Sequence, residues 1–407
     1  MKKGWEAKKL GEVCSFLNRG VSPKYVEKGG IVVLNQRCVR DHRVSFEVGR
    51  RHDIKVKGVS SERLLQAGDV LVNSTGTGTL GRVAQLRENP LEKTTVDSHV
   101  TIVRPTPGLF FQEFFGYMLR DIEDELKESG EGCGGQTELN RSVLAEKFLV
   151  RFPQSLPEQQ RIVGILDEAF AGLATAKANT EKNLQNARAI FESHLQSLFS
   201  QRGKGWVETT LEKVLAVQPQ NGWFPPAAHH SASGTPVLTL SSVTGFNFRA
   251  EKIKFTSAPT DSRRNYWVKN GDFLITRSNT PELVGHVAIA REITNPTIYP
   301  DLIMRMNPAP DRMMTEFLYY QLRSPALRKE ITGRAQGANP TMKKISNGAV
   351  KTLPIVVPSI TTQQAIVKTF NVLTTKTQRL ADIYERKLAA LDALKKSLLH
   401  QAFTGQL

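Results

Sequence analysis

Residues 67–84 read AGDVLVNSTGTGTLGRVA, and this stretch decides how the first half of the chain folds. Gly76, Gly78 and Gly81 have the spacing of a dinucleotide-binding loop, and the apolar residues before them are typical of a strand. The residues after Gly81 alternate like another strand, whereas a cofactor loop requires a helix at that point. The stretch therefore predicts a glycine-rich turn between two strands.

The same pattern returns in the second half of the chain as NGDFLITRSNTPELVGHVA, residues 270–288. Gly68-Asp69 is matched by Gly271-Asp272, and Gly81 is matched by Gly285, but the first two loop glycines are missing from the second copy. We therefore expect a turn that keeps its frame while its loop residues vary.

Two further matches show that the chain starts over halfway. GWEAKKLGEVCSF at residues 4–16 returns as GWVETTLEKVLAV at residues 205–217. Residues 154–200 match residues 358–404, and each of these segments is predicted to be one long helix that begins at a capping serine, Ser155 or Ser359. The sequence thus predicts a repeated order of globular unit and long helix.

Both long helices are predicted to carry an apolar stripe with alternate steps of four and three residues. The stripe residues of the first helix are Ile162, Leu166, Ala169, Leu173, Ala176, Thr180, Asn183, Ala187 and Ile190. Those of the second helix are Ile366, Phe370, Leu373, Thr377, Leu380, Tyr384, Lys387, Leu391, Leu394 and Leu398. Each helix spans about 40 residues, or about 60 Å. Because one chain contains two matching helices, an intramolecular coiled coil is the simplest arrangement, and a coiled coil between two chains is the alternative.

The predicted boundaries place globular units at residues 1–154 and 203–358, and helical segments at residues 155–202 and 359–407. The fold class is α+β, because short strands dominate the globular units. Strands are predicted in the first unit at 31–34, 70–73, 82–86 and 100–103, with a helix at 112–127. The second unit repeats them at 237–240, 273–276, 287–290 and 302–306, with a helix at 315–328.

The composition is basic, with 55 Lys and Arg residues against 39 Asp and Glu residues and a net charge of +16. A basic excess of this size attracts polyanions, so nucleic acid is the leading candidate partner. We find no apolar run long enough to span a bilayer and no secretory signal, which favours a cytoplasmic protein. The three cysteines, Cys14, Cys38 and Cys133, have neither disulfide-framework nor zinc spacing.

Catalytic motifs are missing from the sequence. It contains no GxxxxGK[ST] phosphate loop, no HExxH and no GxSxG motif. Glu125-Leu126-Lys127 is interpreted as a solvated helix face, and His229-His230 as part of a proline-rich loop rather than a metal site. We therefore expect a chain that is not itself an enzyme.

Taken together, these segments resemble the specificity subunits of type I restriction–modification systems over the whole chain. The resemblance rests on the two Gly-Trp openings, on GDVLVNSTGTGTLGRVA at residues 68–84, on the Pro-x-x-x-Pro-Glu-Gln-Gln-Arg-Ile run at 153–162 and on the C-terminal LLHQAFTGQL. It implies two target-recognition domains that each read one half of a bipartite DNA sequence, and two helices that pair antiparallel as a spacer. Two units on a stiff rod suit half-sites in successive major grooves, about 34 Å apart.

The resemblance also implies protein partners. Two methyltransferase subunits would dock on the helices of one specificity subunit, and restriction subunits would join that core. This chain would need no cofactor of its own, whereas the partner subunits would use S-adenosylmethionine, ATP and Mg. The helix starts differ from each other, since Thr361-Thr362 replaces Pro157-Glu158, and this bears on whether partners dock equally at both.

Candidate contacts to double-stranded DNA come from polar and basic loop residues. Hydroxyls and glycines near residue 76 suit a phosphate, whereas Arg277 and Asn279 suit bidentate contacts to guanine and adenine. The full set is Asn35, Gln36, Arg37, Arg40, Arg43, Ser74, Thr75, Thr77, Thr79, Arg82, Gln136, Thr137, Arg141, Arg277, Ser278, Asn279, Thr280, Gln336, Asn339, Thr341, Lys343 and Lys344. For any one of them the plain interpretation is a solvated loop residue.

Two other classes of function stay open at this point. An enzyme that acts on DNA alone would cleave or methylate DNA as the purified chain. A coiled-coil scaffold with protein-binding ends would have no salt-sensitive affinity for DNA.

Overall fold

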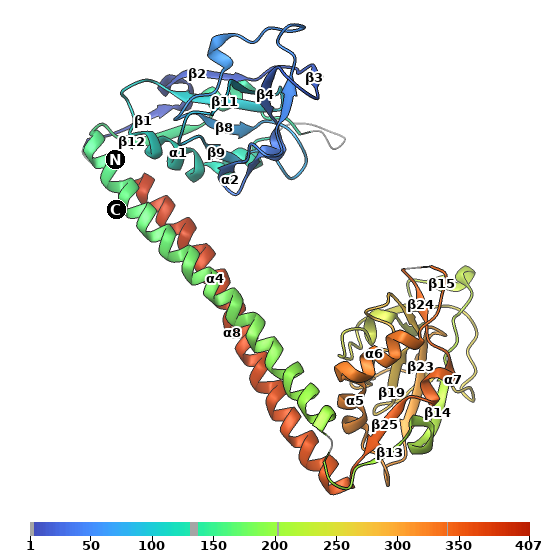
Figure 1. Ribbon diagram of the computed structural model, residues 1–407. Coiled ribbons are helices and arrows are strands. Elements are labelled where there is room, and N and C mark those ends of the chain that lie inside the picture. Colours follow the sequence, from blue (N-terminus) through green and yellow to red (C-terminus); the bar gives the residue numbers. More distant parts are fainter. Residues whose placement is uncertain (1–3, 131–136, 202, 340) are drawn as a thin grey trace. The chain divides into compact units, whose positions relative to one another are not determined.

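The computed structural model describes residues 4–130, 137–201, 203–339 and 341–407. The chain divides into two compact units, one made of residues 1–180 and 386–407 and the other of residues 181–385. Each unit consists of a globular α+β domain and parts of both long helices, α4 (Leu156–Gln201) and α8 (Ile360–Thr404) (Figure 1). Among the described residues, no helix combines the length and the apolar character needed to cross a membrane.

Two sheets and two short strand pairs form the described part of the domain of the first unit. The antiparallel sheet has the order β2 (Cys14–Arg19), β11 (Val100–Pro105), β8 (Val70–Asn73) and β9 (Val83–Gln85). The mixed sheet has the order β10 (Thr94–Val96), β4 (Ile31–Leu34), β7 (Arg50–His52) and β3 (Tyr25–Val26). Strand β1 (Trp5–Lys9) pairs with β12 (Leu149–Pro153), and β5 (Val39–Arg40) pairs with β6 (Arg43–Val44). The helices are η1 (Leu10–Val13), η2 (Gln36–Cys38), η3 (Ser61–Arg63), α1 (Gln112–Asp121), α2 (Glu123–Glu128) and α3 (Arg141–Glu146).

The second unit repeats this order of elements, so the duplication predicted from the sequence extends to the fold. Its antiparallel sheet is β14 (Leu215–Asn221), β23 (Ile303–Pro308), β19 (Phe273–Thr276) and β21 (Val287–Ile289). Its mixed sheet is β15 (His230–Ser231), β17 (Ile253–Thr256), β16 (Thr235–Leu238), β22 (Thr297–Ile298) and β18 (Trp267–Val268). The strand pairs are β13 (Val207–Thr210) with β25 (Pro354–Val357) and β20 (Ser278–Asn279) with β24 (Lys343–Lys344). The helices are η4 (Leu211–Val214), η5 (Ala227–His229), η6 (Leu240–Ser242), α5 (Thr315–Arg323), α6 (Pro325–Arg334) and α7 (Asn347–Lys351).

The predicted strands all exist, with ends that differ by a few residues, but the two predicted short helices are each broken. The first breaks at Ile122 into α1 and α2, and the second breaks at Ser324 into α5 and α6. The hydroxyl of Ser324 accepts a hydrogen bond from the amide of Leu327, so this residue caps a new helix instead of continuing the old one. The α+β fold class is confirmed.

The glycine-rich stretch forms a turn between strands, as predicted, because β8 and β9 pair antiparallel on either side of it. Gly81 has a φ of +80°, and a Cβ atom there would lie 2.6 Å from the backbone nitrogen of Lys127 in α2. Gly285 has a φ of +72°, and a Cβ atom there would lie 2.2 Å from Ile331 in α6. The glycine common to both copies therefore permits a left-handed turn and a close helix, which is an architectural role.

The long helices contribute to both hydrophobic cores. In the first unit, the ring of Phe403 in α8 lies tilted against that of Phe114 in α1, with centroids 5.1 Å apart. In the second unit, Phe199 of α4 lies against Phe317 of α5 at 5.6 Å. The end of one helix and the start of the other thus complete each core.

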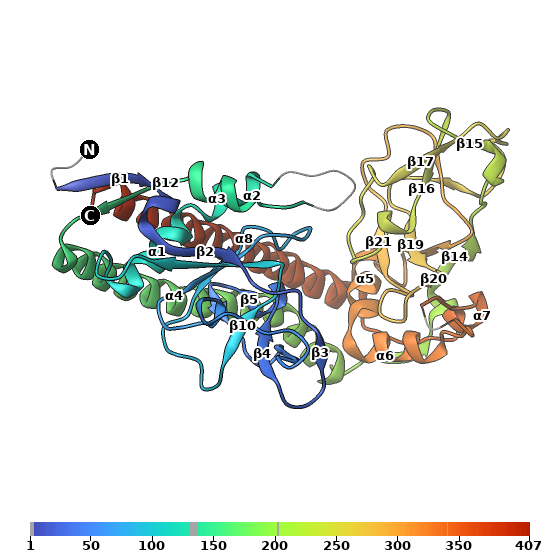
Figure 2. The same cartoon turned by 90° about the horizontal axis from the view of Figure 1, so that it is seen from above.

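Contacts between α4 and α8 follow an antiparallel order. Arg161 donates to the carbonyl oxygen of Leu407 at 3.0 Å, Lys177 pairs with Asp392 at 2.8 Å, and Arg188 pairs with Glu385 at 2.8 Å. Partner numbers in α8 fall as those in α4 rise, and Figure 1 and Figure 2 show the helices side by side. The intramolecular coiled coil is confirmed.

The predicted apolar stripes are only partly right. Asn183, Ile190, Leu380, Lys387 and Leu394 are exposed, and the next residue along faces inward instead: Leu184, Phe191, Ala381, Leu388 and Lys395 are buried or half-buried. A helix with 3.6 residues per turn drifts by about 20° per heptad against a strict repeat, so the inward face moves one position along the sequence.

One buried glutamine fastens the start of each long helix to its domain. Gln159 accepts a hydrogen bond from the amide of Phe111 at 2.7 Å and donates to the carbonyl oxygens of Pro153 at 2.9 Å and Leu109 at 3.2 Å. Both copies of this glutamine are fully buried. Ser155 caps the same helix by accepting from the amide of Glu158 at 3.4 Å, which confirms the predicted cap.

Gln363 makes the corresponding contacts in the second unit. It accepts from the amide of Met314 at 2.8 Å and donates to the carbonyl oxygens of Pro358 and Arg312, both at 2.9 Å. The repeated sequence therefore places the same three-way link in both units.

Replacement of Gln159 by alanine should destabilise the first unit by roughly 2–4 kcal/mol, because three buried backbone groups lose their partner. Hydrogen exchange of the amides of β8 and β11 would measure this locally. The matched control is Gln160→Ala, since Gln160 is exposed and its loss should change stability by about 0.5 kcal/mol or less. Equal effects of the two substitutions would contradict the assigned role.

Candidate nucleic-acid interface

Three segments that were predicted separately meet in the first unit. Thr75 forms an antiparallel bridge with Glu138, and the amide of Gly76 donates to the carbonyl oxygen of Thr137 at 3.3 Å. The hydroxyl of Thr75 donates to the side chain of Gln36 at 3.2 Å. Residues 35–37, 74–79 and 137–139 therefore form one surface, which we call loop cluster 1.

The side chains of loop cluster 1 differ in how exposed they are, and therefore in whether DNA could contact them. Arg37 and Thr77 are exposed, and Gln36, Thr75 and Thr137 are half-buried. Ser74, in contrast, is fully buried, and its hydroxyl lies 2.5 Å from that of Thr101, so the prediction of an accessible hydroxyl is wrong there.

Two further residues of this cluster hold the loops in shape. Thr79 donates back to the carbonyl oxygen of Thr75 at 3.2 Å, and Asn35 accepts from the amide of Arg37 at 2.8 Å as the cap of η2.

The side chain of Arg141 is exposed but donates to Asn18 at 2.9 Å. Gln136 lies outside the described residues.

The hairpin of β5 and β6 presents Arg40 and Arg43 as direct cross-strand partners, and both are exposed. Its two turn residues, Asp41 and His42, have φ values of 52° and 59°, as a type I′ turn requires. Like charges directly opposite one another destabilise a strand pair. An anion at this hairpin would relieve that repulsion.

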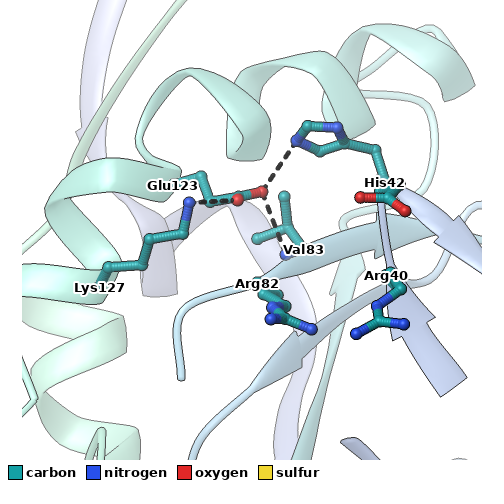
Figure 3. A pocket seen from close by; sticks show the side chains of 7 residues that line it. Arg40, His42, Arg82, Val83, Glu123 and Lys127 are labelled. Atoms are coloured by element: carbon teal, nitrogen blue, oxygen red, sulfur yellow. Dashed lines mark hydrogen bonds and ion pairs between the residues drawn. The ribbon is translucent and has the colours of Figure 1, made fainter. Parts of the chain in front are cut away.

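Beside the hairpin lies a cavity of about 500 Å³ with a carboxylate at its centre (Figure 3). Glu123 lies 3.0 Å from the Nε2 atom of His42 and 2.6 Å from the Nζ atom of Lys127, and it accepts from the amide of Val83 at 3.3 Å. Figure 3 shows the guanidinium groups of Arg40 and Arg82 pointing away from this carboxylate. Glu123 therefore fixes the hairpin against α2 while Arg40 stays exposed; Arg82 is half-buried and donates to the carbonyl oxygen of Gly78 at 2.8 Å.

Burial alone raises the pKa of Glu123, but hydrogen bonds from His42 and Lys127 outweigh it, so the pKa lies below its ordinary 4.5. The stabilising contribution of Glu123 is then complete above pH 4.5 and is lost as the pH falls through the folded-state pKa. Urea unfolding of the full chain and of Glu123→Gln should differ most above pH 4.5, and the gap should close below it. Glu125→Gln, at an exposed neighbouring position, is the control. A difference in unfolding free energy between the full chain and Glu123→Gln that grows as the pH falls would contradict the assigned role of Glu123.

In the second unit, β20 and β24 bring together the two predicted segments. Ser278 pairs with Lys344 and Asn279 with Lys343, and a bridge joins Gln336 to Lys344. We call residues 277–280 and 336–344 loop cluster 2, of which the structure describes all except residue 340. Its exposed side chains include Gln336, Asn339, Thr341 and Lys344.

The two residues predicted to make bidentate base contacts are engaged within the chain. Arg277 is half-buried and donates weakly to the carbonyl oxygen of Asp301 at 3.4 Å, and Asn279 donates to the hydroxyl of Thr244 at 3.3 Å. Thr280 donates its amide to Asn279 at 2.9 Å, and Lys343 donates to the carbonyl oxygen of Gly337 at 2.7 Å. Ser278 is almost completely buried, so its hydroxyl is not on the accessible surface where the sequence placed it.

One part of the second interface was missed from the sequence. Helix η6 follows β16 just as η2 follows β4, and Ser241 is exposed at the position of Arg37. Arg249 donates to the carbonyl oxygen of Ser241 at 2.7 Å and shapes this loop. The available signal was a polar residue directly after an apolar strand, Thr239 as in Asn35, followed by the polar Ser241 and Ser242.

Among the described residues, no group of three or more His, Cys, Asp and Glu side chains has the geometry of a metal site. His229 and His230 lie on an exposed loop at η5 and β15.

Comparison with protein-family models decides what this duplicated arrangement is. The model of the type I restriction modification DNA specificity domain matches twice, at residues 2–185 and 203–386. The chain belongs to this family. It is a specificity subunit with a role in DNA recognition, and the methyltransferase and restriction subunits of such a system are its partners.

Relatives and solved structures agree with this assignment. The chain is 23% identical over 320 residues to the EcoKI specificity subunit of Escherichia coli K12, covering 75% of this chain and 68% of the relative. It is 22% identical over 205 residues to the EcoEI specificity subunit of Escherichia coli, covering 48% of this chain and 34% of the relative.

The fold is also that of solved type I subunits. A chain from a study of complex assembly and conformational transition in a type I system superimposes with a TM-score of 0.79 at 18% identity, covering 100% of this chain and 99% of that one. The HsdS subunit of Thermoanaerobacter tengcongensis gives a TM-score of 0.61 at 18% identity, with 100% and 98% covered.

Proposed function

We propose that each globular domain of this specificity subunit reads one half of a split, asymmetric DNA target. The observation that carries the proposal is the repetition of one frame with different loops: loop cluster 1 and loop cluster 2 occupy matching places but share little sequence. One frame that presents two sets of side chains would read two different half-sites.

The helical pair would set the spacing between the half-sites. Helices of 46 and 45 residues correspond to roughly 70 Å at 1.5 Å per residue. A paired rod of that length suits a target whose halves lie in separate major grooves, about 34 Å apart per turn. We propose the same domain boundaries as the sequence predicts, after residues 154, 202 and 358.

The chain would supply recognition, and its partners would supply chemistry. One specificity subunit would hold two methyltransferase subunits on α4 and α8, and restriction subunits would join them. We propose that the chain is not catalytic and needs no cofactor, while the partners use S-adenosylmethionine, ATP and Mg. The complex would act in the cytoplasm, where its DNA lies.

Co-expression of the chain with its methyltransferase subunit in a host without DNA methylation tests the proposal. Mapping of modified bases should give a single split motif with methyladenine on both strands. Replacement of residues 203–357 by those of a related subunit should change one half of the motif and leave the other half and the spacing intact. Changes in both halves would contradict independent reading by the two domains.

Gln336 and Lys344 offer a matched pair for locating base contacts, because their backbones are bridge partners and both side chains are exposed. Gln336→Ala should cost roughly 1–3 kcal/mol on the target and little on unrelated DNA. Lys344→Ala should weaken binding to both DNAs and reduce the salt slope by about 1. Binding titrations over a salt series measure both effects, and equal loss on target and unrelated DNA would assign Gln336 to the phosphates instead.

A further inference from the structure

A groove in the first unit holds a desolvated arginine without a carboxylate partner. Its volume is about 960 Å³, and it lies between the loop that follows β9 and the two long helices, with Arg120 at its base. The guanidinium of Arg120 stacks on Tyr117 at 4.7 Å and on Phe170 at 5.4 Å. Among the described residues, no carboxylate lies within ion-pair distance of Arg120, although the charge of Glu123 attracts it from farther away. The buried Nε atom of Arg120 has no hydrogen-bond partner, and neither has that of Arg323 in the second unit.

A second cation lies beside Arg120. The Nζ atom of Lys395 in α8 lies 5.4 Å from the ring centroid of Phe170, the same ring that Arg120 contacts. Burial lowers the pKa of both Arg120 and Lys395. The positive charges of Arg120 and Lys177 lower the pKa of Lys395 further, and together with burial they outweigh the carboxylates of Asp392 and Glu123. Two cations that have lost water and face one another are unfavourable in the free chain unless an anion joins them.

The second unit contains the same arginine with its charge balanced. Arg323 occupies the place of Arg120 in the repeat; it lies 3.4 Å from the carboxylate of Glu192 and donates to the hydroxyl of Tyr319 at 2.8 Å. By the same repeat, Phe191 and Glu192 of α4 correspond to Lys395 and Lys396 of α8. An apolar and acidic pair has therefore been exchanged for two lysines, so the missing carboxylate belongs to the first unit alone.

The rest of the groove fits a polypeptide better than DNA. Phe46 is 43% exposed and Leu91 is fully exposed, and both line the groove. Asp41, Glu88 and Glu92 line it beside Arg43 and Arg87, so this part of the groove carries both signs of charge and is not the uniformly basic surface that a phosphate backbone favours. A chain that offers a carboxylate and an apolar side chain would match both features.

We propose that this groove binds an acidic segment of a methyltransferase subunit, with a carboxylate on Arg120 and Lys395 and an apolar side chain against Phe46 and Leu91. The inference rests on the proposed docking of that subunit on the helices. It adds that the two docking places are unequal, since only the first unit requires an acid from the partner.

The test uses the full chain and its methyltransferase subunit. Arg120→Met removes a charge that the free chain does not balance, so its melting temperature should stay level or rise, while affinity for the methyltransferase subunit falls at least about tenfold. Native mass spectrometry should then show one bound methyltransferase subunit rather than two. Arg323→Met, at the matching place, should lower the melting temperature because Glu192 loses its partner.

Lys55→Met makes the same charge change at an exposed position outside the groove and should leave partner binding unaltered. Unchanged partner binding by Arg120→Met would overturn the inference and leave the proposed function standing. A fall in the melting temperature of Arg120→Met as large as that of Arg323→Met would also overturn it. So would an Arg120→Met chain that binds its partner normally but binds DNA more weakly, because the groove would then be a phosphate-binding surface. A wild-type chain that captures no methyltransferase subunit would remove the proposed docking itself.

Discussion

The arrangement of each unit depends on one buried primary amide, that of Gln159 or Gln363. In the first unit this amide joins the start of α4, the end of β12 and the residue before α1, and in the second unit it joins the corresponding three places. The side chain is fully buried and meets one backbone donor and two backbone acceptors. A glutamine side chain has an acceptor oxygen and two N–H donors, so it satisfies all three, whereas a glutamate would offer no donor to either carbonyl. The direction in which each long helix leaves its domain is thereby fixed within the unit, and the repeat ensures that both helices leave in the same way.

This constraint explains which features the sequence could reveal. Strands, capping serines and the β8–β9 turn depend on residues close together in the chain, so their patterns predicted them. The inward-facing residues of the long helices were predicted one position too early at Ile190 and Leu380. A strict heptad repeat ignores the slow rotation of the inward face along a helix with 3.6 residues per turn. Ser74 and Ser278 were wrongly placed on the surface for a different reason: strand neighbours such as Thr101 bury them, and no local pattern reports that. The Gln159 link joins residues about 50 positions apart, and a Gln-Gln pair in the sequence does not show which glutamine turns inward.

The loop clusters separate framework from variable contacts. Asn35, Thr79 and Arg249 hydrogen-bond to backbone atoms of their own loops and so order them before any ligand arrives. A loop ordered in advance loses less entropy on binding, which makes specific contacts more effective. The side chains of Arg37 and Gln336 are exposed and are not among those that hold the loops in shape. They can therefore change while the loop keeps its conformation.

Duplication gives two copies of a surface, yet the copies need not keep the same task. Arg120 and Arg323 occupy matching places and each lies over aromatic rings, but the rings differ, since Arg120 contacts Tyr117 and Phe170 whereas Arg323 contacts Phe191, Phe246 and Tyr319. The place of the Glu192 carboxylate is taken by the ammonium of Lys396, which pairs with Asp124. In the second unit the guanidinium is therefore satisfied from within and rigidifies the junction of α5 with α4. In the first unit the same group lacks an internal acid and raises the energy of the free chain, and that energy is recovered only when a partner supplies the acid. A single charge exchange can thus convert a structural ion pair into a docking site, and the duplicated frame makes the exchange tolerable because the other copy keeps the original pairing.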